Sequence, residues 1–220
     1  MKAKWYVVTK PDSARGIYET WAECKALVNR VRGARYQSVE SREKAEAMLG
    51  DGIVLPAGTY AFTDGNAQGG VGVVIVDGGG SAPPKEHAVS VAQVFAGQGI
   101  AGLETDDDVE AALEGLHNIL AELAGLFLAL RLVPPPTELT IVHDYKGIAA
   151  WMEGRWKTRN PIVTSVVTAC RQLVQDRGLV VTYQHQRGHQ SSWAGRDDFA
   201  YWNDRADKLA TRAGGSTIFD

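Results

Sequence analysis

The chain has 220 residues, of which 45% are hydrophobic and 22% charged, and its formal net charge is −3. This is ordinary globular composition, so it excludes wholesale disorder, and at roughly 100–200 residues per domain it predicts one or two domains. Without an apolar run of about 18 residues or an apolar leader after Met1, we expect neither a membrane-spanning segment nor a signal peptide.

Charge is spread unevenly along the chain. Residues 1–48 carry ten Lys/Arg against six Asp/Glu, a net +4, and the remainder carries thirteen against twenty, a net −7. A small basic module joined to a larger acidic one is typical of a module that meets a polyanion, although a chance fluctuation in a short segment gives the same balance. With only Cys24 and Cys170, we expect a reducing, cytoplasmic compartment rather than a disulfide scaffold.

Residues 1–49 are predicted to form a small α+β domain. Strand-forming residues at 5–9 and 36–39 alternate with two helices, which begin after Thr20 and Ser41. Glu23 stands three residues after Thr20 and completes a capping box. The glycines and proline of residues 50–58 then predict a linker.

Residues 59–214 are predicted to form a second, α/β domain, followed by a tail at 215–220. Two strands separated by a glycine-rich turn come first, and later strands alternate with helices, which favours a mixed sheet covered by helices. The predicted strands span residues 59–64, 71–77, 88–95, 139–143 and 179–185. The predicted helices span residues 109–132, 145–153, 161–176 and 203–213.

Two acids lie where a carboxylate is costly. Asp64 ends a strand and shares its face with Tyr60 and Phe62, and Gly65 after it allows a backbone or ligand to come close. The alternative for Asp64 is a turn aspartate at the end of the strand. Glu122 lies inside the long helix, where its neighbours include no cation, so it needs a positive charge or a metal unless its face is wet.

Two further acids have simple alternatives. Asp144 directly follows a strand, which is where α/β sheets bind ligands, but it could equally cap the next helix. Asp207 comes early in the last helix and could be a partner of the helix dipole. Four carboxylates without a Cys or His cluster would suit hard ions, and two-metal phosphodiester hydrolysis requires such a site.

An ordered set of motifs resembles the type 1 ribonuclease H family over most of residues 58–214. The motifs are Thr63-Asp64-Gly65, Asn118 with Ala121-Glu122, His143-Asp144, Gly188-His189, and Asn203 to Ala210. The resemblance implies a ribonuclease H-like mixed five-stranded sheet flanked by helices. It also implies that Asp64, Glu122, Asp144 and Asp207 are catalytic ligands of two Mg²⁺ ions, with Mn²⁺ as an alternative.

The same resemblance assigns further residues. Asn118 would sense ribose 2′-hydroxyls in the minor groove, and Gly65 would also bind the substrate. His189 would assist proton transfer or product release, and the alternative is a turn histidine satisfied by the backbone. The segment from Gln190 to Ala206 is longer than in compact members of the family.

Residues 4–49 resemble the N-terminal hybrid-binding domain attached to many such enzymes. The resemblance implies that Trp21 and Tyr36 stack on DNA sugars with Tyr6 beside them, and it places Gln37 and Ser38 where lysine is common. Aromatics near arginines form a stacking and charge surface, although they could instead be the core of a tiny domain.

Together these features predict an endoribonuclease that hydrolyses the RNA strand of RNA–DNA hybrids by a two-metal-ion mechanism, leaving 3′-hydroxyl and 5′-phosphate ends. The expected partner is the hybrid, not a membrane, and a monomer is expected. One alternative is a non-catalytic hybrid-binding protein, and another is a DNA-cutting nuclease of the same fold. A further alternative uses the N-terminal module for protein or RNA contacts.

Overall fold

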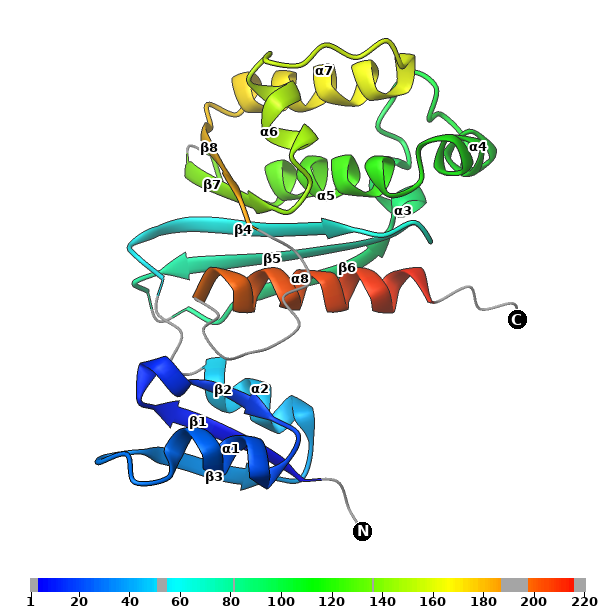
Figure 1. Ribbon diagram of the computed structural model, residues 1–220. Helices are drawn as coiled ribbons and strands as arrows, with labels where there is room; N and C mark the ends of the chain where they lie inside the picture. The colour runs from blue at the N-terminus through cyan, green and yellow to red at the C-terminus, as the bar shows by residue number, and fades with distance from the viewer. Residues whose placement is uncertain (1–3, 51–54, 81, 136, 187–197, 216–220) are drawn as a thin grey trace. The chain divides into compact units, whose positions relative to one another are not determined.

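The computed structural model describes residues 4–50, 55–80, 82–135, 137–186 and 198–215 (Figure 1). The chain divides into two compact units. Unit 1 comprises residues 1–54 with 189–200, and unit 2 comprises residues 55–188 with 201–220. In the described ranges, no helix is both long enough and apolar enough to cross a membrane.

Unit 1 contains a three-stranded antiparallel sheet in the order β2-β1-β3. The strands are β1 (Trp5–Lys10), β2 (Gly16–Tyr18) and β3 (Arg35–Val39), and the helices are η1 (Asp12–Ala14), α1 (Trp21–Val28) and α2 (Arg42–Gly50). The predicted capping box is present, since Thr20 and Glu23 each bond the other's backbone N–H. Val8, Tyr18, Cys24 and Val28 pack together in the core.

Unit 2 is built on a mixed five-stranded sheet in the order β6-β5-β4-β7-β8. Its strands are β4 (Gly58–Gly65), β5 (Gly70–Gly78), β6 (Lys85–Ser90), β7 (Glu138–His143) and β8 (Val180–His185). The first three pair antiparallel, whereas β7 runs parallel to both β4 and β8. The predicted fold class is therefore confirmed.

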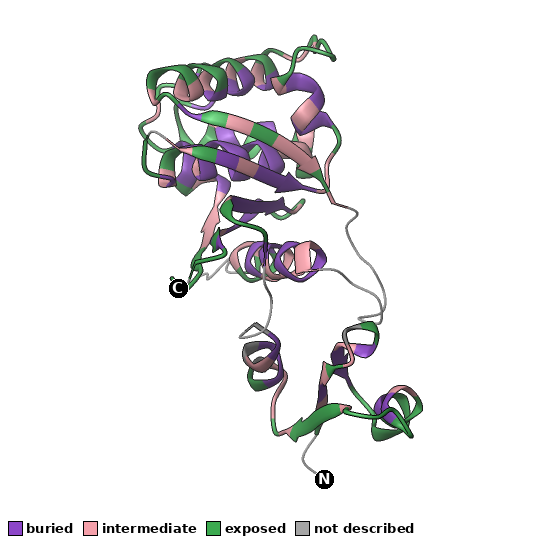
Figure 2. Cartoon of the chain, turned by 90° about the vertical axis from the view of Figure 1, so that its left-hand side faces the viewer, coloured by how far each residue is buried: buried purple, intermediate pink, exposed green. Residues whose placement is uncertain are grey.

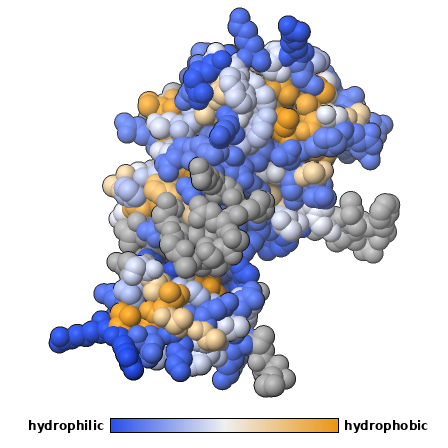
Figure 3. Space-filling model, viewed as in Figure 1, coloured by the Kyte–Doolittle hydropathy of each residue, from blue (hydrophilic) through white to orange (hydrophobic). Residues whose placement is uncertain are grey.

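Helices cover both faces of this sheet. They are α3 (Val91–Phe95), α4 (Asp106–Leu116), α5 (Asn118–Leu132), α6 (Gly147–Met152), α7 (Pro161–Asp176) and α8 (Asp198–Gly214). Helices α5 and α7 lie on one side of the sheet and α8 on the other (Figure 1). Buried residues line the sheet and the inner sides of the helices, and exposed residues occupy the outer sides (Figure 2). The solvent-facing surface in Figure 3 is mostly hydrophilic with smaller hydrophobic areas.

The predicted helix over residues 109–132 is two helices. His117 has φ +50°, in the left-handed region, so it ends α4 and begins α5. The apolar spacing continues across this residue, and for that reason the sequence indicated one helix. The break gives α5 its own direction and makes Asn118 its first residue.

The predicted strand over residues 88–95 is also wrong in its second half. Strand β6 ends at Ser90, whose side chain accepts a hydrogen bond from the N–H of Gln93 and caps α3. Val91, Val94 and Phe95 are then buried at helical spacing. Over so short a stretch, the apolar residues of a helix and those of a strand cannot be told apart by their spacing, which is why the sequence predicted a strand.

Candidate active site

Three of the predicted acids meet at the carboxyl ends of two central strands in the sheet of unit 2. Asp64 lies near the end of β4, Asp144 directly follows β7, and Glu122 projects from the second turn of α5. One carboxylate oxygen of each lies within 4.8 Å of the others. Because β4 and β7 are parallel neighbours, their carboxyl ends lie side by side at the same end of the sheet. Ligand sites of α/β sheets lie at the carboxyl ends of the strands.

A glycine allows this approach between helix and strand. A Cβ atom at Gly65 would stand 2.2 Å from the carbonyl carbon of Ala121 and 2.4 Å from the nitrogen of Glu122. The backbone of α5 therefore packs directly on the end of β4, with Gly125 against Thr63 one turn later. Gly65 thus serves the site through packing, which brings Glu122 beside Asp64.

Burial changes the acidity of these carboxyls. Asp64 is 5% exposed, and its burial, followed by the charges of Asp144 and Asp207, raises its pKa to about 8. Burial and the charges of Asp64 and Asp144 raise the pKa of Glu122, which is 2% exposed, well above its usual range. The Gly65 N–H offsets part of both shifts by bonding the charged forms.

The cluster has the chemistry of a divalent cation site. Within the described residues, Oε2 of Glu122 is buried without a hydrogen-bond partner. No ion pair of those residues includes Asp64, Glu122 or Asp144. Converging carboxylates without a counter-charge are costly, and oxygen-only donors suit Mg²⁺ or Mn²⁺. The residues present therefore fit a hard metal ion.

The alternatives for Glu122 and Asp144 fail on position. A wet face of the helix is excluded for Glu122 by its burial. Asp144 does not cap the next helix, because the N-cap position of α6 is Lys146.

Asp207 approaches the cluster from the other face of the sheet. It is half-buried on α8, and its charge contributes to the raised pKa of Asp64. Helix α8 packs closely on β5, since a Cβ at Gly72 would stand 2.0 Å from the carbonyl oxygen of Ala206. The helix begins at Asp198, so Asp207 lies in its interior and not at the dipole-favoured start.

Asn118 and His189 are the remaining site residues that the sequence predicts for the second domain. Asn118 is exposed at the first position of α5, one turn before Glu122. His189 lies outside the described residues.

In unit 1, the predicted contact residues form an aromatic row. The ring centroids are 5.6 Å apart for Tyr6 and Trp21 and 5.4 Å apart for Trp21 and Tyr36. Trp21 is 39% exposed and Tyr36 is 49% exposed, so these two rings are not core residues. Gln37 and Ser38 are exposed on β3, and strand alternation places Ser38 on the face of Tyr36.

Sequence reasoning gave no role to three residues next to the cluster. Nε2 of His185 lies 2.9 Å from the backbone oxygen of Asp144, and the His185 ring meets the buried ring of His143 edge-on. Burial and the charge of Glu122 raise the pKa of Tyr145. The signal was present in the sequence, because both histidines end predicted strands of the same mixed sheet.

The family model of the ribonuclease H1 N-terminal domain matches residues 4–49. A search of curated proteins finds no significant match. Among solved structures, RNase H1 from the halophilic archaeon Halobacterium salinarum NRC-1 is similar to 70% of this chain over 96% of its own, with 19% identity and a TM-score of 0.47.

Two further similar structures are of LC11-RNase H1, which was isolated from compost by a metagenomic approach. One covers 71% of this chain and 94% of its own, with 22% identity and a TM-score of 0.46. The other, in complex with an RNA/DNA hybrid, covers 70% and 95%, with 22% identity and a TM-score of 0.44. The match of the family model therefore makes residues 4–49 similar to the ribonuclease H1 N-terminal domain.

Proposed function

We propose that the chain is an endoribonuclease that hydrolyses the RNA strand of RNA–DNA hybrids and leaves 3′-hydroxyl and 5′-phosphate ends. The observation that carries the proposal is the convergence of Asp64, Glu122 and Asp144 within 4.8 Å at the carboxyl ends of β4 and β7. Buried acids that repel one another are unfavourable, and binding of nucleic acid alone does not require them.

The acids of the site would hold a pair of Mg²⁺ ions, or Mn²⁺ in their place. Asp64, Glu122 and Asp144 offer the converging oxygens, and Asp207 adds its charge from α8. When bound, such ions supply Lewis-acid chemistry that activates water and stabilises the leaving 3′ oxygen. His189 would move the proton that this chemistry requires, following its resemblance to the family histidine.

Hybrid selectivity would come from residues outside the acids. Asn118 stands exposed one turn before Glu122, where an amide can donate to and accept from a ribose 2′-hydroxyl. In unit 1, the match of residues 4–49 to the model of the ribonuclease H1 N-terminal domain supports a hybrid-binding role. The exposed rings of Trp21 and Tyr36 would stack on the DNA strand.

The test compares four labelled substrates: RNA–DNA hybrid, duplex RNA, single-stranded RNA and duplex DNA, each with Mg²⁺. We expect the wild type to cut only the RNA strand of the hybrid. Asp144→Asn should lose at least about 100-fold in rate, because the amide keeps the shape but removes a charge from the site. Asp107→Asn, an exposed acid at the start of α4, is the matched control and should cut like the wild type.

The outcomes separate the alternatives. Cleavage of duplex DNA would indicate a DNA nuclease of the same fold. Tight hybrid binding without cleavage by the wild type would indicate a non-catalytic binding protein. Unchanged cleavage by Asp144→Asn would place the chemistry elsewhere in the molecule.

A further inference from the structure

Strands β7 and β8 end in a pair of histidines that the proposed chemistry does not use. His143 and His185 face each other in the parallel register, and their ring centroids lie 6.0 Å apart at 67°. His143 is fully buried, whereas His185 is exposed. The two rings therefore occupy adjacent positions at the edge of the sheet where Asp144 leaves β7.

His185 makes its hydrogen bond to the main chain of Asp144. Its Nε2 lies 2.9 Å from the backbone oxygen of Asp144. A carbonyl oxygen only accepts hydrogen bonds, so this nitrogen carries the proton and donates it. The contact acts on the acid through its peptide group.

This hydrogen bond continues the pairing of the strands past the end of the ladder. The β7–β8 register ends at His143 and His185. The N–H of Gln186 then donates to the carbonyl of His143 at 2.8 Å, and His185 holds the carbonyl that follows. His185 and Gln186 thus hold two successive carbonyls at the point where Asp144 leaves β7.

We propose that His185 is a positioning residue that fixes the peptide plane of Asp144 and thereby the direction of its carboxylate. This inference deepens the proposed function, because it names a residue that acts on the acid cluster without belonging to it. Removing a residue that hydrogen-bonds a metal-ligating residue, without binding the metal itself, typically lowers metal affinity or activity by roughly 10–100-fold. The side chain of His185 is exposed, so its replacement leaves the core intact.

Variants of the full chain separate positioning from packing. His185→Phe keeps a ring and loses the donor, His185→Ala loses both, and His185→Gln keeps an N–H donor. The matched control is His87→Phe, which makes the same change on β6, the strand at the opposite edge of the sheet. Thermal unfolding of each variant checks that the fold is retained.

Two readouts are measured. Mn²⁺ binding by calorimetry without nucleic acid should weaken about tenfold or more in His185→Phe and His185→Ala. For cleavage of a short hybrid, kcat should fall by a similar factor in these two variants while KM stays within about twofold. His185→Gln and His87→Phe should stay within about threefold of the wild type in both measurements.

The results test the positioning role of His185 and the proposed function independently. Wild-type Mn²⁺ affinity in His185→Phe and His185→Ala would overturn the positioning role, as would an equal loss in His185→Gln. Absence of Mn²⁺ binding by the wild type would overturn it as well. Weakened Mn²⁺ binding in the two donor-free variants, in a protein that does not cut hybrid, would support the positioning role and end the proposed function.

Discussion

At the scale of single residues, the main feature is a set of acids that retain protons. Asp64 and Glu122 are buried against each other and against Asp144, so ionising all three without a cation is unfavourable. The metal-free protein therefore holds protons that the unfolded chain releases at the same pH. Stability and metal binding are linked through these protons.

We predict that the metal-free protein loses stability as the pH rises from about 4 to about 8. The pKa of Asp64 is raised from 3.8 to about 8 in the folded state, so over this range the folded state binds more protons than the unfolded state. The free energy of unfolding should then fall by up to about 1.4 kcal/mol per pH unit for each such proton. Urea unfolding in a chelator across this range measures the slope.

The variants for this measurement are matched in charge. Asp64→Asn removes one of the titrating groups and should give a shallower slope. Asp77→Asn, at an exposed position near the end of β5, should keep the slope of the wild type. Identical slopes for Asp64→Asn and the wild type would contradict the prediction, and Mg²⁺ should stabilise the wild type most at the alkaline end.

At the scale of secondary structure elements, the acids are placed by close packing of helices on strands. Helix α5 rests on Gly65 of β4, and helix α8 rests on Gly70 and Gly72 of β5. These contacts leave no room for a Cβ atom, so only glycine allows the helices to pack this closely. Helix α5 packs on one face of the sheet and α8 on the other (Figure 1). Glycine at these positions is what brings Glu122 and Asp207 toward Asp64.

Gly65→Ala should separate α5 from β4. The added methyl group would overlap the backbone at Ala121 and Glu122, so we expect a loss of about 1–3 kcal/mol in the free energy of unfolding and weaker Mn²⁺ binding. Gly115→Ala is the control, because nothing lies within 4 Å of a Cβ there and alanine favours α4. Denaturant unfolding and calorimetry of both variants test this, and equal stability of the two would refute it.

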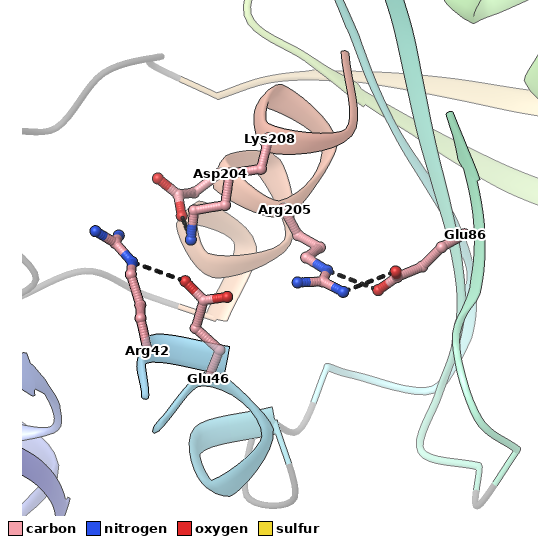
Figure 4. A network of polar contacts seen from close by, with 6 residues as sticks. All are labelled: Arg42, Glu46, Glu86, Asp204, Arg205 and Lys208. Carbon is pink, nitrogen blue, oxygen red and sulfur yellow. Dashed lines mark hydrogen bonds and ion pairs between the residues drawn. The ribbon is translucent and has the colours of Figure 1, made fainter. Parts of the chain in front are cut away.

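An ion pair also ties α8 to the sheet. Nε and Nη2 of Arg205 donate to the two carboxylate oxygens of Glu86 on β6, at 2.7 and 2.8 Å (Figure 4). The two side chains are 33% and 29% exposed, which limits the gain through solvent screening. The pair is therefore a modest lock between α8 and the edge strand.

A double-mutant cycle on Glu86→Ala and Arg205→Ala should give a coupling energy of about 0.5–1 kcal/mol in favour of the pair. The reference is the Lys208–Asp204 pair, which lies within α8 and should couple by about 0.3–0.5 kcal/mol. High salt should weaken both couplings. A coupling near zero for the first pair at low salt would show that packing alone holds α8.

At the scale of the whole molecule, the chain contains two units with separate cores. Residues 1–48 are basic on balance and the rest is acidic. Unit 1 presents exposed aromatic rings, and unit 2 contains the acid cluster. Under the proposed function, unit 1 would be a tether that raises the local concentration of nucleic acid at unit 2.

Removing residues 1–49 should leave cleavage of short hybrids in place and weaken binding to long hybrids. The salt dependence should become shallower, by roughly 0.7–0.9 in the log–log slope for each phosphate that the protein no longer neutralises. Trp21→Ala in the full chain should weaken binding by about 1–3 kcal/mol with an unchanged salt slope, because stacking carries no charge. Equal affinity and equal slope with and without residues 1–49, measured by fluorescence anisotropy at several salt concentrations, would rule out the tether.

Much of the fold could be predicted from the sequence because local patterns determine it. Strand alternation placed Asp64 beside Tyr60 and Phe62, and the Thr20 capping box marked the start of α1. The break at His117 could not be predicted in this way, because the apolar spacing runs through it and only a backbone angle separates α4 from α5.

The sequence by itself identified the candidate side chains for the proposed function: acids at strand ends and inside an apolar helix, and aromatics beside arginines. Their resemblance to a known order of motifs supplied the proposed roles. The tertiary structure decided what spacing cannot, namely that Asp64, Glu122 and Asp144 meet within 4.8 Å and that His185 reaches the backbone of Asp144. These contacts join residues far apart in the chain, so they depend on strand register and on helices packed against glycines, which no local pattern specifies.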